Sequence, residues 1–251
     1  MLKKYHQEDY IGEYIITNTT FSNGKKHESR EWVDVSVTNE LHNKVAHVIG
    51  NGESRSNFKL KSLAEVHGGL LAKKMGQTYG CNAVYRDFSP DFLILNNSII
   101  AQEFADRFPN NTTTAFTYTK NILQNIGKYH LIPYNIKLCA GATAAYLACF
   151  HGHKTIYLLG FDNQKDAGTN NNIYAGTTAY SSKQSNISDS VFIRDLNQVM
   201  STYDDVEFVR IVKFENTIVP DMWKWRDNFR QIDYRHYISE CDIGVSLNYL
   251  K

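Results

Sequence analysis

The chain contains the stretch Val45-Ala46-His47-Val48-Ile49-Gly50-Asn51-Gly52-Glu53-Ser54-Arg55. Its apolar run, residues 45–49, predicts a buried strand, and Gly50-Asn51-Gly52 predicts a tight turn after it. Ser54 favours a helix start, and the segment from Asn57 to Val66 is compatible with a helix. Glycines let a ligand approach the backbone, and free N–H groups at a helix start face negative charge. The stretch therefore predicts a phosphate- or nucleotide-binding crevice at the carboxyl end of a parallel strand.

The spacing of this turn excludes two common phosphate-binding motifs. Arg55 stands where a dinucleotide-binding fingerprint would have its third glycine, and no Gly-Lys-Ser/Thr follows as in a P-loop. A G-x-G turn after a strand is also a frequent structural turn. The motif alone leaves binding and plain turn formation as equal alternatives.

From residue 45 onward, predicted strands and helices alternate. Apolar runs predict strands at 77–82, 92–95, 113–118, 155–159 and 206–211, the last taken as the final strand. Helical patterns fall within 58–74 and at 99–107, 141–151 and 190–200. Alternation of this kind predicts an α/β fold with a Rossmann-like, mostly parallel sheet and helices on both faces.

The two ends of the chain differ from this central part. Two alternating segments flank Ser22-Asn23-Gly24-Lys25, an Asn-Gly turn signal, so residues 1–44 are expected to form an N-terminal β-hairpin extension. Residues 45–215 form the expected Rossmann-like domain. Residues 216–251 are expected to be a tail that packs on the core through its aromatic side chains, Trp223, Trp225, Phe229, Tyr234 and Tyr237.

Composition limits the partners and the compartment. The net charge of +1 provides no overall attraction for nucleic acid or membrane, although the first 30 residues are locally basic at Lys3-Lys4, Lys25-Lys26-His27 and Arg30. A solvated face is the favoured interpretation of that basic segment. No apolar run approaches about 18 residues and the N-terminus lacks a secretory signal, so no membrane span is expected. Four cysteines without metal-ligand spacing favour reduced core thiols and a cytoplasmic location.

Three further groups are candidates for the carboxyl edge of the sheet. Asp162 follows the strand at 155–159, so it either contacts a ligand or caps the next element. Asn82 ends the strand at 77–82 in an apolar setting, which favours ligand binding over a plain turn role. The start of the small-residue helix, Gly141-Ala142-Thr143, offers N–H groups, with Thr143 as an alternative cap.

Several of these segments together resemble one enzyme family. Gly50-Asn51-Gly52-Glu53-Ser54 is similar to the G-N-G-P-S turn of the bacterial sialyltransferases of family 42, and residues 79–85 resemble their R-C-N-x-F-Y segment. Residues 140–162 resemble their S-G, helix and G-Y-K-E-I-Y-L-S-G-I-D succession. Order and spacing agree over roughly residues 45–200. A looser resemblance, through Pro90-Asp91-Phe92-Leu93-Ile94, links the chain to the motility-accessory-factor or MptE-like group.

The resemblance implies a glycosyltransferase that takes a sugar from a CMP- or UDP-linked donor without a metal or other cofactor. The acceptor would be a glycan, a protein or a modified nucleic-acid base. The implied nucleotide-binding positions are Gly50, Asn51, Gly52, Ser54, Arg55, Asn82, Ala140, Gly141, Ala142 and Thr143. A loop over residues 166–188 is expected to close over the donor and the acceptor.

The catalytic residues of the family match less well. Gln164 stands in the place of the family's phosphate-contacting tyrosine, and residues 183–189 contain no histidine where the family has its catalytic one. Tyr174 and Tyr180 in the loop are the candidate replacements. Asp162 is a candidate base, with Asp166 and Asp189 as weaker ones. His151 and His153 flank a turn, where structural roles are favoured.

Two alternatives stay open at this point. An MptE-like pyrophosphokinase would need Mg²⁺ and clustered carboxylates, but Asn96-Asn97 stand where an acid would help. The other alternative is a catalytically inactive nucleotide-binding module for assembly. Such a module would form a homo-oligomer through residues 1–44.

Overall fold

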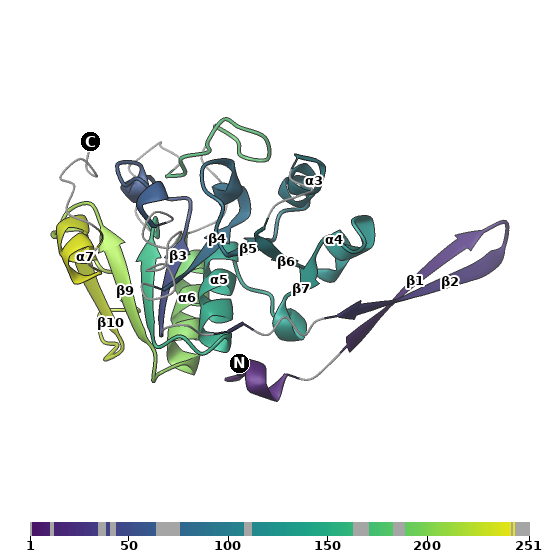
Figure 1. The fold of residues 1–251 in the computed structure, drawn as a ribbon, viewed down its shortest axis with the longest axis horizontal. Helices are drawn as coiled ribbons and strands as arrows, with labels where there is room; N and C mark the ends of the chain where they lie inside the picture. The colour runs from purple at the N-terminus through teal and green to yellow at the C-terminus, as the bar shows by residue number, and fades with distance from the viewer. Residues whose placement is uncertain are drawn as a thin grey trace.

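The computed structural model describes residues 2–10, 13–34, 39–40, 44–63, 76–107, 112–162, 171–182, 189–241 and 243. Its main feature is an eight-stranded sheet in the order β10-β9-β8-β3-β4-β5-β6-β7, in which every pairing is parallel (Figure 1). The strands are β3 (Val45–Ile49), β4 (Gln77–Cys81), β5 (Phe92–Leu95), β6 (Thr114–Thr117), β7 (His130–Leu131), β8 (Thr155–Leu159), β9 (Glu207–Val212) and β10 (Phe229–Asp233). The α/β fold class predicted from the sequence is confirmed.

The order of the strands reverses once. The chain passes outward from β3 through β4, β5 and β6 to β7, and then returns to β8 on the other side of β3. From there it continues to β9 and β10. In open α/β sheets, ligands bind at the carboxyl ends of the strands beside such a reversal. The topology therefore directs attention to the turns that follow β3, β8 and β4.

Helices cover both faces of the sheet. In the described residues, the α-helices are α3 (Ser98–Arg107), α4 (Thr119–Gln124), α5 (Ala140–Phe150), α6 (Asp189–Thr202) and α7 (Tyr234–Glu240), and the 3-10 helices are η1 (Gln7–Asp9), η2 (Glu53–Arg55), η3 (Asn82–Arg86) and η4 (Pro133–Asn135). α5 packs beside α6 and against β3, β4 and β5. Side chains of α7 and α3 belong to two other apolar clusters, which also contain Ile49 of β3 and Leu93 of β5 respectively. Ten of the eleven residues of α5 are buried, because its alanines allow close packing on the sheet.

The predicted N-terminal hairpin is also confirmed. β1 (Glu13–Ser22) and β2 (Lys25–Asp34) pair antiparallel, with Ser22 opposite Lys25. Asn23 and Gly24 have φ values of 52° and 71°, as a two-residue type I′ turn requires. The hairpin extends away from the sheet, and its base contacts α4 and β7 (Figure 1).

Three predictions of local structure need correction. Residues 206–211 are not the final strand, because β10 follows and extends the sheet beyond residue 215. The helix expected from Asn57 begins only at residue 61 in the described part, and residues 64–75 lie outside it. The segments α4 and β7 were not predicted. In the C-terminal region Trp223 is buried, as expected of a packed aromatic tail, but Trp225 is 88% exposed.

Histidines beside the amino end of β8 have the structural role expected of them. The hydroxyl of Tyr79 lies 2.8 Å from Nδ1 of His151 and 2.9 Å from Nε2 of His153. Burial, together with the neighbouring His153, lowers the pKa of His151 to about 3. The four cysteines are free thiols, and Cys81, Cys149 and Cys241 among them are buried. Within the described residues, no helix has both the length and the apolar character needed to cross a membrane.

Candidate functional site

The turns after β3 and β8 are packed directly against each other. The amide of Gly50 donates to the carbonyl of Leu159 over 2.7 Å, and the amide of Gly52 donates to the carbonyl of Gly160 over 2.9 Å. A Cβ atom on Gly50 would lie 2.6 Å from the Gly160 oxygen, and one on Gly52 would lie equally close to it. Contact between the two turns therefore explains these glycines without a ligand. The sequence analysis attributed these two glycines to the close approach of a ligand to the backbone.

The amides that follow this turn bond to acceptors of the chain itself. Ser54 N donates to Oδ2 of Asp162 over 2.6 Å, and Glu53 N donates to Oδ1 of Asn171 over 2.9 Å. Both amides belong to η2, a single 3-10 turn rather than the predicted α-helix start. A carboxylate is a favourable partner for such free N–H groups. In this conformation Asp162 therefore binds the start of η2, an earlier element of the chain, and the cap predicted on the element after Asp162 falls at residues outside the described part.

Arg55 lies beneath the turn. It is 3% exposed, and its Nε donates to the carbonyl of Gly50 over 2.6 Å. Its Nη2 donates to the hydroxyl of Tyr174 over 2.8 Å and lies 3.3 Å from Oδ2 of Asp87. The Tyr174 hydroxyl in turn donates to the same Asp87 oxygen over 2.7 Å. Burial raises the pKa of Tyr174, and the hydrogen bond to Asp87 raises it further.

These contacts determine how two predicted site residues can act. Arg55 and Tyr174 are both buried, and their polar groups bond to each other and to Asp87. We call Arg55, Asp87 and Tyr174 the arginine triad, in which only the carboxylate of Asp87 is exposed. Arg86, the neighbour of Asp87 in the sequence, pairs with Glu103 over 2.6 Å.

Residues 171–182, which we call the lid segment, are docked on the ends of β3 and β4. Ile173 N donates to the carbonyl of Asn51 over 2.9 Å, and Nδ2 of Asn51 donates to the hydroxyl of Tyr180 over 3.1 Å. Arg86 donates to Oγ1 of Thr177 over 2.7 Å and to the carbonyl of Thr178 over 3.2 Å. Part of the predicted 166–188 loop thus covers Asn51. Asp166, Gln164 and residues 183–188 lie outside the described residues.

Tyr180 differs from Tyr174 in its surroundings. Its hydroxyl contacts Asn51, whose Oδ1 lies 4.0 Å from the sulfur of Cys81, and its ring is partly exposed. Burial raises the pKa of Tyr180, so this phenol stays protonated near neutral pH and can donate a hydrogen bond. Of the two predicted tyrosines, Tyr180 is therefore the one beside Asn51 at the strand ends.

The turn from β4 towards β5 has a different hydrogen-bonding pattern. Asn82 adopts a left-handed φ of 48°, which asparagine tolerates well. Its Oδ1 accepts from the amides of Asn96 and Asn97 over 3.0 and 3.3 Å. Asn96 directly follows β5, and its Nδ2 donates to the carbonyl of Leu138 over 3.0 Å and to the Tyr118 hydroxyl over 3.2 Å. The Oδ1 atom of Asn96 is buried and has no hydrogen-bond donor among the described residues.

The start of α5 lies between these two turns. Leu138, two residues before the helix, contacts Asn96, while a Cβ atom on Gly141 would lie 3.0 Å from the ring of Phe161 after β8. Amides of Gly141 and Ala142 approach the sulfur of Cys139, whose pKa burial raises to about 12. The first turn of α5 therefore runs along the carboxyl edge of the sheet, with its N–H groups at that edge.

The predicted positions in this helix are not equally available. Ala140, Ala142 and Thr143 are buried, and the Thr143 hydroxyl donates to the carbonyl of Cys139 over 3.0 Å. Gly141 is partly exposed. The structure thus brings together Asn51, Tyr180, Asn82 and the start of α5, and it adds Asn96, which the sequence analysis did not propose. Its position directly after a strand was the available signal.

One group of residues has the types and spacing of metal ligands in the described part of the chain: Glu215, Asp233 and His236. Asp233 caps α7, because its Oδ1 accepts from the amide of His236 over 2.8 Å and lies 2.9 Å from its Nδ1. This local capping explains the cluster.

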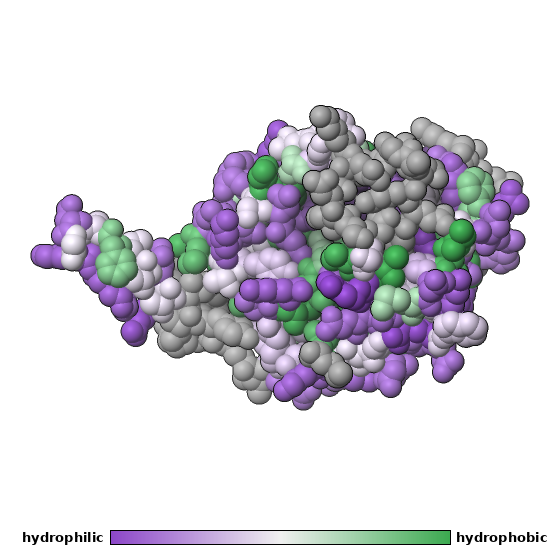
Figure 2. Space-filling model, turned by 180° about the vertical axis from the view of Figure 1, so that it is seen from behind, coloured by the Kyte–Doolittle hydropathy of each residue, from purple (hydrophilic) through white to green (hydrophobic). Residues whose placement is uncertain are grey.

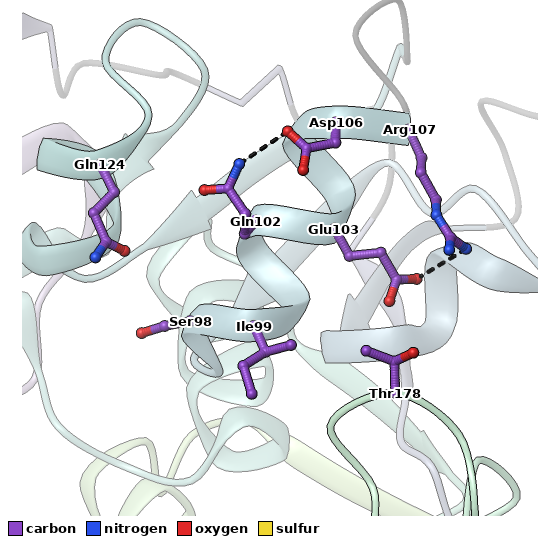
Figure 3. A pocket seen from close by; sticks show the side chains of 8 residues that line it. All are labelled: Ser98, Ile99, Gln102, Glu103, Asp106, Arg107, Gln124 and Thr178. Atoms are coloured by element: carbon purple, nitrogen blue, oxygen red, sulfur yellow. Dashed lines mark hydrogen bonds and ion pairs between the residues drawn. The ribbon is translucent and has the colours of Figure 1, made fainter.

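A pocket of about 670 Å³ lies on the outer side of α3 (Figure 3). It is lined by Ser98, Ile99, Gln102, Glu103, Asp106, Arg107, Gln124 and Thr178. None of the predicted site residues lines it. Glu103 is paired with Arg86 and Arg107, and Gln102 donates to Asp106 over 2.9 Å. The pocket therefore borders the lid segment at Thr178 but offers few unpaired polar groups.

No protein-family model matches the chain, and no curated protein sequence matches it either. Among solved structures, the chain is similar to the crystal structure of an alpha-2,3-sialyltransferase from Campylobacter jejuni in apo form. The sequences are 16% identical, and the TM-score is 0.43. The alignment covers 71% of this chain and 79% of the other. This similarity assigns no role to any residue.

Proposed function

We propose that this chain is a glycosyltransferase that binds a nucleotide sugar at the carboxyl ends of β3, β4 and β5. The observation that carries the proposal is the buried Oδ1 of Asn96, which has no hydrogen-bond donor in the described part of the chain and lies beside Asn82 and the start of α5. A buried acceptor without a donor costs about 1–3 kcal/mol, which a ligand N–H or O–H group would recover. The motifs that resemble family 42 sialyltransferases contain Asn51 and Asn82 at the same edge. A cytidine or uridine nucleotide carries donors of the required kind on its base and ribose.

Within this proposal the two other asparagines position the nucleotide. Asn51 extends its amide towards Tyr180, and a ligand would exchange for that contact. Asn82 uses its Oδ1 to hold the β5 turn, which leaves its Nδ2 as the donor for a ligand. The first N–H groups of α5 at Gly141 favour a negative charge and suit the donor phosphate.

The transfer itself needs a base and donors for the leaving group. The acceptor hydroxyl oxygen would attack the anomeric carbon while the bond from that carbon to the phosphate oxygen breaks. The acceptor proton would pass to Oδ1 of Asp162, since Oδ2 already accepts from Ser54. The nucleotide would leave with its phosphate stabilised by the Tyr180 hydroxyl and the α5 amides, without a metal ion.

Ligand-induced thermal stabilisation tests the binding step. A ligand that binds only the folded chain raises the melting temperature by mass action. We expect CMP- or UDP-linked sugars to raise it equally with and without Mg²⁺. A shift only with ATP or GTP plus Mg²⁺ would instead support the pyrophosphokinase alternative.

A matched pair of variants locates the binding site. Asn96→Ala removes the unpaired acceptor and should weaken nucleotide binding about tenfold in calorimetry. Asn125→Ala is the control, because Asn125 bonds to Gln102 beyond the strand ends. Equal binding by both variants would place the nucleotide elsewhere.

Turnover separates an enzyme from a binding module. Release of free CMP or UDP in the presence of a glycan acceptor would demonstrate transfer. Tyr180→Phe should lower the rate at saturating donor while leaving donor affinity within about twofold. Binding without release, with a panel of glycan, protein and nucleic-acid acceptors, would favour the catalytically inactive module.

A further inference from the structure

The distal half of the hairpin is exposed on both of its faces. Every residue from 17 to 30 is exposed, and these residues form six pairs across β1 and β2, closed by the turn at residues 23–24. We call this segment the arm. At about 3.3 Å per residue it extends roughly 20 Å beyond the hairpin base. Figure 1 shows that it projects away from the sheet and its helices.

The register of the arm separates its side chains into two polar faces. Asn18, Thr20 and Ser22 share one face with Lys25, His27 and Ser29, and Thr17, Thr19 and Phe21 share the other with Lys26, Glu28 and Arg30. Phe21 is the one large apolar side chain in residues 17–30, and it is 75% exposed. Because neither face is apolar, the arm is not suited to dock on a hydrophobic surface. An isolated two-stranded hairpin is also marginal in water, so a polar partner would stabilise it.

The arm carries more positive charge than the chain as a whole. Lys25, Lys26 and Arg30 contribute three positive charges and Glu28 one negative charge, a net charge of +2, whereas the whole chain has +1. Glu28 is paired with Lys26. The remaining side chains are mainly hydroxyls and amides, and Figure 2 shows the projecting arm as largely hydrophilic. A hydrated, negatively charged partner matches this surface.

We propose that the arm binds duplex DNA by inserting into the major groove. That groove is about 12 Å wide and admits a two-stranded β-ribbon. The cations Lys25, Lys26 and Arg30 would contact phosphates, while Asn18, Ser22 and the threonines reach the base edges or sugars. A second copy of the chain is a poorer match, because its arm would carry the same positive charge. This inference goes beyond the proposed function and does not depend on it.

Fluorescence anisotropy with a 25-base-pair duplex tests this inference in the intact chain. Up to three phosphate contacts predict a slope near −3 for log affinity against log salt concentration between 50 and 200 mM. The triple variant Lys25→Gln, Lys26→Gln, Arg30→Gln should bind at least tenfold more weakly at 50 mM salt and show a slope near zero. All three positions are exposed, so the melting temperature should change little.

A second triple variant provides the matched control. Lys44→Gln, Lys120→Gln and Lys224→Gln remove the same charge from exposed positions outside the arm, and should leave the affinity and the slope unchanged. Equal loss in both variants, or no binding by the wild type, would overturn the proposal. Equal binding of an acidic polysaccharide or of single-stranded DNA would contradict insertion of the arm into the major groove of a duplex. A dimer in sedimentation that dissociates in the arm variant, without DNA binding, would assign the arm to a second copy.

Discussion

Two neighbouring turn regions at the carboxyl edge of the sheet differ in their hydrogen bonds. After β3, the glycine turn interlocks with the turn after β8, and its amides are bonded to Leu159, Gly160 and Asp162. After β4 and β5, Asn82 accepts from the amides of Asn96 and Asn97, and Oδ1 of Asn96 is buried with no hydrogen-bond donor among the described residues. A glycine-rich turn is therefore not by itself a ligand site. The two turns differ in their amide groups, which the β3 turn uses within the chain, whereas Oγ of Ser54 and Oδ1 of Asn96 are both buried without a hydrogen-bond partner among the described residues.

Gly52→Ala is expected to lower the free energy of unfolding more than any other variant discussed below. The backbone of Gly52, with φ of −68°, suits alanine, but a Cβ atom would lie 2.5 Å from Oδ2 of Asp162 and 2.6 Å from the Gly160 oxygen. We expect a loss of about 3 kcal/mol in the free energy of unfolding, measured with urea. Gly127→Ala is the control: nothing lies within 4 Å of its Cβ, so only its φ of 74° costs about 1 kcal/mol. Equal losses would show that the two turns are not interlocked.

Loss of stability in acid is expected to arise at His151, which lies at the amino edge of the sheet, opposite both turns. The pKa of His151 is lowered to about 3, so the unfolded chain binds a proton there below its ordinary value of about 6.5 while the folded chain does not. Stability is therefore lost as the pH falls from about 6.5 towards 3, by about 1 kcal/mol per pH unit. His151→Gln should flatten this slope in urea titrations at pH 4–6. An unchanged slope would assign the acid sensitivity to other groups, including those at the turns.

Tyr174→Phe tests the arginine triad, which connects the lid segment to the turn after β3. Loss of the hydroxyl leaves Arg55 and Asp87 without their shared partner, and we expect a cost of about 1–2 kcal/mol and faster proteolysis within residues 171–182. Tyr129→Phe removes another buried hydroxyl, bonded to Ala101, away from the lid segment. It should lower stability without exposing that segment. The same cleavage pattern in both variants would contradict a specific role for the triad.

Asn82→Asp changes the turn after β4 and should have the smallest effect on stability of the four variants. The substitution preserves the acceptor for the amides of Asn96 and Asn97, and the cost in unfolding should stay below about 0.5 kcal/mol. It replaces the free Nδ2 donor with a negative oxygen, so nucleotide affinity in calorimetry should fall at least tenfold. Unaltered affinity would mean that Asn82 is only a turn residue.

The sequence predicts those parts of the fold where side chains repeat with a clear period. The apolar runs of β3, β5 and β8 and the small-residue helix α5 are of this kind. β10 was missed because all five of its residues are half-buried and polar residues separate Phe229 from Ile232, as suits an edge strand. Helix α4 has six residues, too few to show a helical repeat.

Some residues of the candidate site could also be predicted from the sequence, whereas others are visible only in the structure. Asn51 and Asn82 were predicted because each follows a strand, and that rule would also have found Asn96. The bond between Arg55 and Tyr174 joins residues 119 positions apart, so only the folded chain reveals it. The sequence also does not show which atoms are already used: Ser54 and Asp162 were both proposed for a ligand, and the amide of Ser54 donates to Oδ2 of Asp162.

The interlocked turns also have an evolutionary consequence. A side chain at residue 50 or 52 would collide with the backbone of Gly160, and one at residue 160 would lie 3.0 Å from the carbonyl of Gly50. No one of these positions can accept a larger residue unless the opposite turn moves away. In relatives of this chain, the three glycines should therefore persist or be replaced together. Correlated replacement would mark a family branch whose central strands have moved apart.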